Sequence, residues 1–237
     1  MTVEMRRVVV VTGGAHGIGA AIAARLSCIG WRVVIADRDE AAAAPPGGRL
    51  EVCDVSDEQA VDRLITGIRG AEGRLDAIVC NAGVNIRKPI ARLSLSEWST
   101  VLAVNLTATF LIVRAAEPLL RAAKGSVVTI ASTRAHMSEP DTEAYAASKG
   151  GLVALTHALA VSLAPDVRVN CISPGWILTK GPQPRQDEHA FHPAGRVGMP
   201  EDVAGLTAFL LGPDSAFITG AEFMLDGGVT RKMIYPE

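Results

Sequence analysis

A tyrosine and a lysine stand four residues apart, at Tyr145 and Lys149, in a stretch that is apolar on nearly every side. The stretch, residues 144–164, is predicted to be a helix, so this spacing places both side chains on one face. A free phenol has a pKa of about 10, which burial raises, so tyrosine is a poor base near neutral pH. An ammonium at roughly 4 Å, with an effective dielectric constant near 20, contributes about 4 kcal/mol, or about three pKa units. The pair is therefore predicted to let Tyr145 exchange a proton near physiological pH.

Two further polar residues interrupt apolar segments. Ser132 lies just past the run SVVTI, at the carboxyl end of a predicted strand, where open sheets bind ligands. Asn105 interrupts an apolar helical stretch, and a buried amide needs hydrogen-bond partners. Each has a structural alternative, because Ser132 could be a cap or turn residue and Asn105 a satisfied core amide.

A glycine-rich loop, TGGAHGIG at 12–19, lies between the first predicted strand and helix. It is not a literal GxGxxG, but its glycines would let the backbone approach a pyrophosphate at the helix N-terminus. The alternative is a tight turn with close helix packing.

Asp37 ends the second strand, 20 residues after Gly17, which is close to the spacing of a carboxylate that binds the adenosine ribose. Such a carboxylate favours NAD over NADP, although Arg38 could reach a phosphate and Asp37 could be a solvated turn residue.

The elements that must position these residues follow an alternating pattern. Seven apolar, β-branched runs are predicted to be strands, and helical patterns separate most of them. The strands lie near 7–14, 31–39, 49–55, 74–83, 125–132, 167–175 and 221–228, and the helices near 17–30, 57–72, 96–123, 143–164 and 201–211. This order is typical of an α/β fold, and we expect one domain over 1–237: a doubly wound, Rossmann-type, seven-stranded parallel sheet with helices on both faces.

Two connections stand out. The second crossover, residues 39–48, is short and rich in proline and glycine, so we expect a turn or a loop there. The segment 176–195 is long for a connection in a compact domain and follows the carboxyl end of a strand, which predicts a substrate-binding loop.

The composition excludes several classes of protein. The formal net charge of −2 offers no basic field for a nucleic acid. No stretch reaches the roughly 18 uninterrupted apolar residues of a membrane helix, and no signal peptide is expected, so we predict a cytoplasmic protein with no membrane partner.

The four cysteines are scattered and are expected to be reduced and buried. His189 and His192 have a possible metal spacing but no clear third ligand, so no metal is predicted.

The motifs TGGAHGIG, CDV, NAG, YAASK and PGWILT, with Asn105 and Ser132 in their places between them, resemble the short-chain dehydrogenase/reductase family. The resemblance covers essentially the whole chain, including SAFITGAEFMLDGG at 215–228. It implies that Tyr145 is the general acid/base for hydride transfer between a substrate carbon and nicotinamide C4. Lys149 would bind the nicotinamide ribose and lower the tyrosine pKa, Ser132 would bind the substrate oxygen, and Asn105 would hold a water of a proton relay.

The resemblance also implies a cofactor-binding set. Its members come from the glycine loop, the ends of four strands and the catalytic helix: Gly13, His16, Gly17, Ile18, Gly19, Asp37, Arg38, Asp54, Val55, Asn81, Ala82, Gly83, Tyr145, Lys149, Pro174, Gly175, Ile177 and Thr179. The cofactor expected is NAD, with NADP the alternative. The chain departs from the family in its short second crossover, and we expect no C-terminal domain like that of the longer epimerases and dehydratases.

The expected substrate is a small polar secondary alcohol or ketone, such as a sugar, polyol or hydroxy acid. Arg87, Lys88, Arg134 and His136 could meet a carboxylate or hydroxyl groups, or could simply be solvated. A 3-oxoacyl-type carbonyl reductase and a non-catalytic NAD-sensing regulator are the alternatives. The helix 150–164 is apolar around most of its circumference, which predicts a homodimer or homotetramer. The tail residues Met233, Ile234 and Tyr235 are a further candidate contact with a neighbouring subunit.

Overall fold

The protein is described by a computed structural model over residues 6–233, so Ile234 and Tyr235 lie outside the described residues. Seven strands form one parallel sheet in the order β3-β2-β1-β4-β5-β6-β7. They are β1 (Val8–Thr12), β2 (Arg32–Asp37), β3 (Arg49–Val52), β4 (Ala77–Cys80), β5 (Ser126–Ile130), β6 (Arg168–Pro174) and β7 (Glu222–Leu225). The predicted Rossmann-type fold is confirmed. The strand order reverses between β1 and β4, and ligands of open sheets bind at such a switch point.

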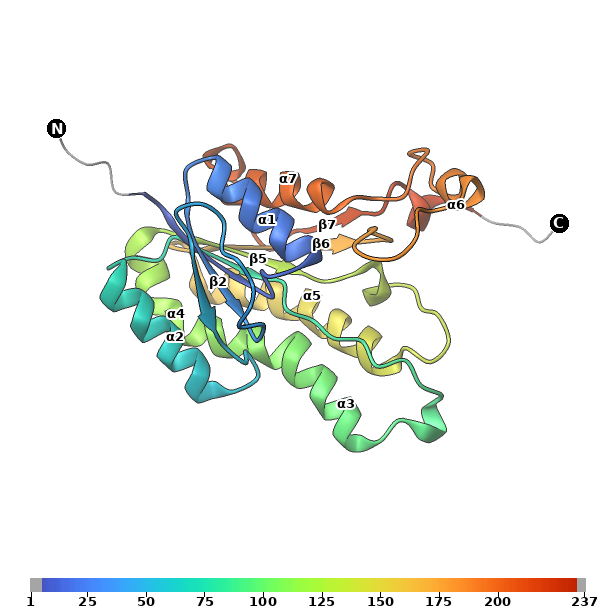
Figure 1. Ribbon diagram of the computed structural model, residues 1–237, viewed down its shortest axis with the longest axis horizontal. Helices are drawn as coiled ribbons and strands as arrows, with labels where there is room; N and C mark the ends of the chain where they lie inside the picture. Colours follow the sequence, from blue (N-terminus) through green and yellow to red (C-terminus); the bar gives the residue numbers. More distant parts are fainter. Residues whose placement is uncertain (1–5, 234–237) are drawn as a thin grey trace.

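Helices cover both faces of the sheet (Figure 1). On one face, α1 (Gly17–Cys28) and α7 (Pro200–Leu211) pack on alternate residues of the strands, with Ile22 of α1 fully buried. On the other face lie α2 (Glu58–Ala71), α4 (Ala108–Ala123) and α5 (Glu143–Leu163). Every residue of β1, β4 and β5 is buried, which explains why these runs are mostly apolar.

The helix predicted at 96–123 is continuous but irregular. It consists of α3 (Leu95–Leu102), a π-helical turn (Ala103–Thr107) and α4. In the π turn the N–H of Ala108 donates to the carbonyl oxygen of Ala103, five residues earlier. The turn contains Asn105, and π turns are frequent at functional sites. Short 3₁₀ turns occur elsewhere, at Ile90–Arg92, Thr133–Ala135, Pro213–Ser215 and Val229–Arg231.

The two unusual connections differ in outcome. The second crossover contains turns and no helix, as predicted. The segment 176–195 is not a bare loop, because it contains the short helix α6 (Gln186–Phe191), in which His189 lies.

All four cysteines are free, and Cys28 is exposed, which contradicts the prediction that all are buried. Cys28 is the last residue of α1 and does not belong to its buried residues, which are Gly19, Ile22, Ala23 and Leu26.

Two helical stretches are long and apolar enough to cross a membrane. They are Leu95–Ala123 and Glu143–Leu163, with mean hydropathies of 1.5 and 1.2. Length and composition are weak evidence for a membrane span, because the core helix of a soluble protein meets the same criteria. Both stretches contribute residues to the buried clusters on the sheet, so their apolar character is accounted for in part by packing.

Candidate active site

The glycine loop brings the backbone close to the carboxyl end of the neighbouring strand. Gly13 has a φ of +61°, and a Cβ there would lie 2.9 Å from Cα of Ala82. The Asn81 amide holds the loop by donating to the carbonyl oxygens of Thr12 and Gly13, both at 3.0 Å. The loop leads into α1, whose first N–H groups have no partner within the helix and attract an anion.

Three carboxylates lie around the end of β2. Asp37 accepts the N–H of Ala15 at 3.0 Å, which ties this carboxylate to the glycine loop. Asp39 forms a 2.7 Å pair with His16, and this hydrogen bond lowers the pKa of Asp39. Arg38 lies 3.9 Å from Asp54, whose pKa is held below its usual range by Ser56 and, to a smaller extent, by Arg38. The guanidinium at this edge therefore has a carboxylate beside it.

Asp37, Arg38, Asp54 and His16 line a first cavity of about 360 Å³ at the switch point. Most of the cofactor set predicted from the sequence lines it: Gly13, His16, Gly17, Ile18, Asp37, Arg38, Asp54, Val55, Asn81, Ala82, Gly83 and Thr179. The sequence analysis missed Ala36, Cys53, Val84, Val104 and Lys180, which line the same cavity. Ala36 and Cys53 could have been found, because each adjoins a strand-end carboxylate that had been selected.

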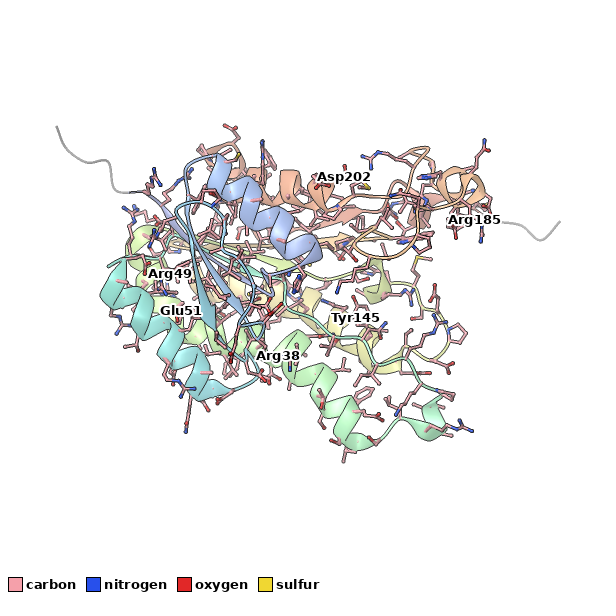
Figure 2. The ribbon with its side chains drawn as sticks, viewed as in Figure 1. Arg38, Arg49, Glu51, Tyr145, Arg185 and Asp202 are labelled. Carbon is pink, nitrogen blue, oxygen red and sulfur yellow. The ribbon has the colours of Figure 1, made fainter. Side chains whose placement is uncertain are left out.

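Tyr145 and Lys149 converge on α5, with the Lys149 Nζ 5.5 Å from the centre of the tyrosine ring. Figure 2 labels Tyr145 on this helix and Arg38, which follows the end of β2. Lys149 is 3% exposed, and its ammonium donates to the carbonyl oxygen of Ile130 at 2.8 Å. Burial lowers the pKa of Lys149 to about 8.

The pKa of Tyr145 differs from the prediction. Burial raises the pKa of Tyr145, and this outweighs a hydrogen bond from Ser132 and the charge of Arg134, which both lower it. The prediction that Lys149 brings this pKa near neutrality is wrong for the protein alone. The physical reason is that the ammonium is itself desolvated and is directed to Ile130.

Asn105 joins three segments of the site. Its Oδ1 accepts the N–H of Val84 at 2.8 Å, and its Nδ2 donates to the carbonyl oxygen of Val84 and to the Ser148 hydroxyl. A Cβ at Gly83 would lie 3.5 Å from the Asn105 Oδ1 and 3.6 Å from the Lys149 Nζ. The amide is thus satisfied and fastens the segment after β4 to α5.

A second cavity, of about 770 Å³, contains the tyrosine and the serine. Its lining comes from the ends of β4 to β7, α5 and the segment 176–195: Asn85, Ser132, Thr133, Arg134, Met137, Ser138, Glu139, Tyr145, Gly175, Trp176, Ile177, Phe191, His192, Asp226 and Val229. Val84 and Thr179 line the first cavity, whereas their near neighbours in the sequence, Asn85 and Ile177, line the second. The two cavities therefore meet between these segments.

Some predicted residues line neither cavity, namely Gly19, Asn105, Lys149 and Pro174. Lys149 lies directly behind Gly83, and Gly19 packs against the glycine loop, where a Cβ would meet the carbonyl oxygen of Gly13. Asp226 was missed, although it directly follows β7 at the edge where ligands bind.

The basic residues considered for substrate binding are all paired. Arg87 and Arg134 both contact Glu139, and Lys88 contacts Glu97. His136 lies 2.8 Å from Glu222. Within residues 6–233, no group of three or more His, Cys, Asp or Glu side chains could hold a metal ion.

Comparisons with known proteins agree with this geometry. A family model described as enoyl-(acyl carrier protein) reductase matches residues 13–230. An uncharacterized oxidoreductase of Thermotoga maritima is 46% identical, over 98% of each chain. The D-threitol dehydrogenase of Mycolicibacterium smegmatis is 37% identical, over 95% of this chain and 94% of the relative. The solved structure of the aldohexose dehydrogenase of Thermoplasma acidophilum matches with a TM-score of 0.91 and 30% identity, over 98% of each chain.

The chain belongs to the short-chain dehydrogenase/reductase family, whose members are oxidoreductases that use NAD(P). The residues present fit such a dinucleotide. The left-handed Gly13 and Gly17 keep side chains out of the first cavity, and the N-terminus of α1 faces the same loop. Asp37 stands at the end of β2, where the ribose of a bound dinucleotide would lie.

Proposed function

We propose that this protein is an NAD(H)-dependent oxidoreductase that interconverts a secondary alcohol and a ketone. The observation that carries the proposal is the meeting of the two cavities. One is lined by the glycine loop and Asp37, and the other holds Ser132 and Tyr145 together. A dinucleotide in the first would bring its nicotinamide end to the substrate in the second.

The four catalytic residues have separate roles in this proposal. Tyr145 removes the hydroxyl proton of the alcohol, or returns it to the ketone oxygen in the reverse direction. Ser132, which is 9% exposed, donates a hydrogen bond to the same substrate oxygen. Asn105 holds the segment at 83–85 in place, and a water beside it would carry the proton onward. The cofactor, when bound, accepts or supplies the hydride.

Lys149, whose Nζ lies 5.5 Å from the centre of the Tyr145 ring, binds the nicotinamide ribose in this proposal. With a pKa of about 8, it is mostly protonated at neutral pH despite its burial. To act as a base, Tyr145 needs a lower pKa, whereas burial raises it. The hydrogen bond with Ser132 and the charge of Arg134 lower the pKa of Tyr145, and the positive nicotinamide ring of an oxidised cofactor would lower it further.

Several features support NAD rather than NADP. Asp37 and Asp54 place two carboxylates in the lining of the first cavity, at the adenosine end, where they would repel a 2′-phosphate. Arg38 is the candidate phosphate ligand, but it has Asp54 beside it.

The substrate is proposed to be small and polar, which the hydroxyl, amide and charged groups of the second cavity support. The names of two relatives, a D-threitol dehydrogenase and an aldohexose dehydrogenase, agree with a polyol or sugar. A second candidate is the reduction of the keto group of a 3-oxoacyl thioester, and the acyl-carrier-protein substrate in the description of the matching family model agrees with it. Met137, Trp176 and Phe191 supply apolar surface for an acyl chain.

The assembly is proposed to be a homodimer or homotetramer in the cytoplasm. On α5, Ala147, Ala154, Ala158 and Val161 are exposed, and Val161 is 79% exposed. Small and apolar side chains along one helix allow a second helix to pack closely, so this face is the proposed subunit contact.

The proposal is tested by following absorbance at 340 nm with NAD and NADP and a panel of sugars, polyols, hydroxy acids, secondary alcohols and acyl thioesters. Tyr145→Phe should lower kcat at least about 100-fold, because general acid/base catalysis contributes about 10²–10⁴-fold. NADH binding should persist in this variant. Ser132→Ala should also lose turnover, whereas Ser162→Ala, at an exposed position of α5, serves as the matched control. Full activity of Tyr145→Phe would remove the tyrosine from this role, and cofactor binding without turnover in either direction would favour a regulator.

A further inference from the structure

Two arginines share one carboxylate at the wall of the substrate cavity. The Arg134 guanidinium lies 2.8 Å from the Glu139 Oε2, and the Arg87 guanidinium lies 3.1 Å from the same oxygen. Arg134 and Glu139 both line the second cavity, together with Ser132 and Tyr145. Two members of the Arg–Glu–Arg cluster (Arg87, Glu139 and Arg134) therefore belong to the wall that a substrate meets, and Arg87 contacts Glu139 from outside that lining.

The backbone fixes the cluster in place. The hydroxyl of Thr142 donates to the carbonyl oxygen of Glu139 at 2.6 Å. The N–H of Lys88 donates to the carbonyl oxygen of Asp141 at 3.2 Å, which joins the segment of Arg87 to the segment of Glu139. Arg134 follows Ser132 in a 3₁₀ turn, and its N–H donates to the Ser132 hydroxyl. The cluster is thus held from both sides of the cavity.

The charged side chains that line the second cavity offer little net positive charge to bind an anion. Among the described residues that line the second cavity, Arg134 is the only arginine or lysine, and Glu139 neutralises it. Asp226 adds a further carboxylate to the lining, and the N–H groups of Gly228 and Thr230 bind it. A substrate carboxylate would have to displace Glu139 and would then remain close to two carboxylates.

We propose that Glu139 is a specificity-determining residue that restricts this site to uncharged, hydroxylated substrates, aldoses and polyols, and excludes the corresponding carboxylates. This inference rests on the proposed alcohol/ketone activity and narrows its substrate class. Because Glu139 pairs with both arginines, their positive charges no longer attract a substrate carboxylate. The Glu139 carboxylate also accepts hydrogen bonds from substrate hydroxyls.

The remaining lining is suited to such a substrate. The Asn85 amide and the hydroxyls of Thr133 and Ser138 are both donors and acceptors, as sugar hydroxyls require. Trp176 is 46% exposed and presents apolar ring surface to the C–H groups of a sugar. Uncharged polar groups and aromatic surface bind a polyol without needing a net charge.

The test compares matched pairs of substrates. The best neutral alcohol from the panel is measured against its analogue in which a terminal CH₂OH is replaced by a carboxylate, and kcat/KM is determined for both. The wild type should prefer the neutral compound. Glu139→Gln frees both arginines, so it should shift the ratio toward the carboxylate at least about tenfold, equivalent to about 1.4 kcal/mol.

Two further variants make the result specific. Arg134→Gln added to Glu139→Gln should reverse most of the gain, because it removes the arginine on the cavity wall. Glu117→Gln removes a carboxylate that also pairs with an arginine, Arg121, but on α4 and outside the lining of this cavity, and it should leave the ratio unchanged.

Failure of this inference can be separated from failure of the proposed function. Turnover of alcohols with a preference for the carboxylate, or a ratio that Glu139→Gln does not move, would overturn the role of Glu139 while the activity stands. If no alcohol is turned over, D-glucose and D-glucuronate are titrated calorimetrically into the protein with NADH. Tighter binding of D-glucose, with a shift toward D-glucuronate in Glu139→Gln, would support the inference, and equal affinities would overturn it.

Discussion

The close packing of Gly19 against the glycine loop predicts a large effect for one added methyl group. In Gly19→Ala, the new Cβ would lie 2.1 Å from the carbonyl oxygen of Gly13 and 2.6 Å from the Asn81 amide nitrogen. Ordinary contacts between such atoms are about 3.5 Å. The Gly13 oxygen already accepts a hydrogen bond from Asn81, so neither neighbour can move without disturbing the loop.

The size of the effect follows from two opposing contributions. Overpacking costs about 1–3 kcal/mol, and replacing glycine by alanine within a helix returns about 0.5–1 kcal/mol. The expected net loss is about 1–2 kcal/mol in the free energy of unfolding, which corresponds to a fall in Tm of about 2–8 °C for a chain of this size. NADH affinity should fall at least about tenfold, because the displaced loop lines the cofactor cavity.

The matched control is Gly67→Ala in α2. Gly67 is also a helical glycine, but a Cβ there would meet nothing within 4 Å. This variant should be more stable than the wild type by about 0.5–1 kcal/mol and should bind NADH normally. Thermal unfolding and NADH titration of both variants make the comparison. If Gly19→Ala melts at or above the wild-type temperature and binds NADH equally well, the close approach of α1 to the loop is refuted.

Two further predictions concern charge. Asp37→Asn keeps an acceptor for the N–H of Ala15 but removes the charge, so the ratio of kcat/KM for NADP over NAD should rise at least about tenfold, or about 1.4 kcal/mol; a ratio within twofold of the wild type would contradict the ribose assignment. Lys149→Met should alter the pH dependence of stability, because burial lowers the pKa of Lys149 from 10.5 to about 8. Between these values the unfolded state binds more protons than the folded state, so the wild type gains stability as pH rises through this window. The variant lacks that gain, and urea unfolding at pH 7.5 and 9.5 should show its stability relative to the wild type falling by about 1–2 kcal/mol; parallel profiles would show that the buried lysine is not desolvated.

Much of the fold could be predicted because its signals are local. Uniformly apolar runs identify strands buried on both faces, and β1, β4 and β5 are buried along their whole length. In a parallel sheet all carboxyl ends meet at one edge, so polar residues just after the runs, such as Asp37 and Ser132, could be assigned to one site before any contact was known.

Other features depend on contacts between distant segments. The π turn around Asn105 coincides with the contacts of its amide with Val84 and Ser148, which are far away in the sequence. No local pattern shows that Arg87 and Arg134 share one carboxylate, because residues 52 and 5 positions away from Glu139 in the chain meet only after the loops at this edge pack.

The sequence by itself determined the fold class, the family and most of the polar groups that line the first cavity, since these depend on periodicity and on short motifs. The tertiary structure alone decided the protonation behaviour of Tyr145 and Lys149 and the charge of the substrate cavity. Desolvation and ion pairing depend on which groups surround an atom in space, and a one-dimensional pattern does not contain that information.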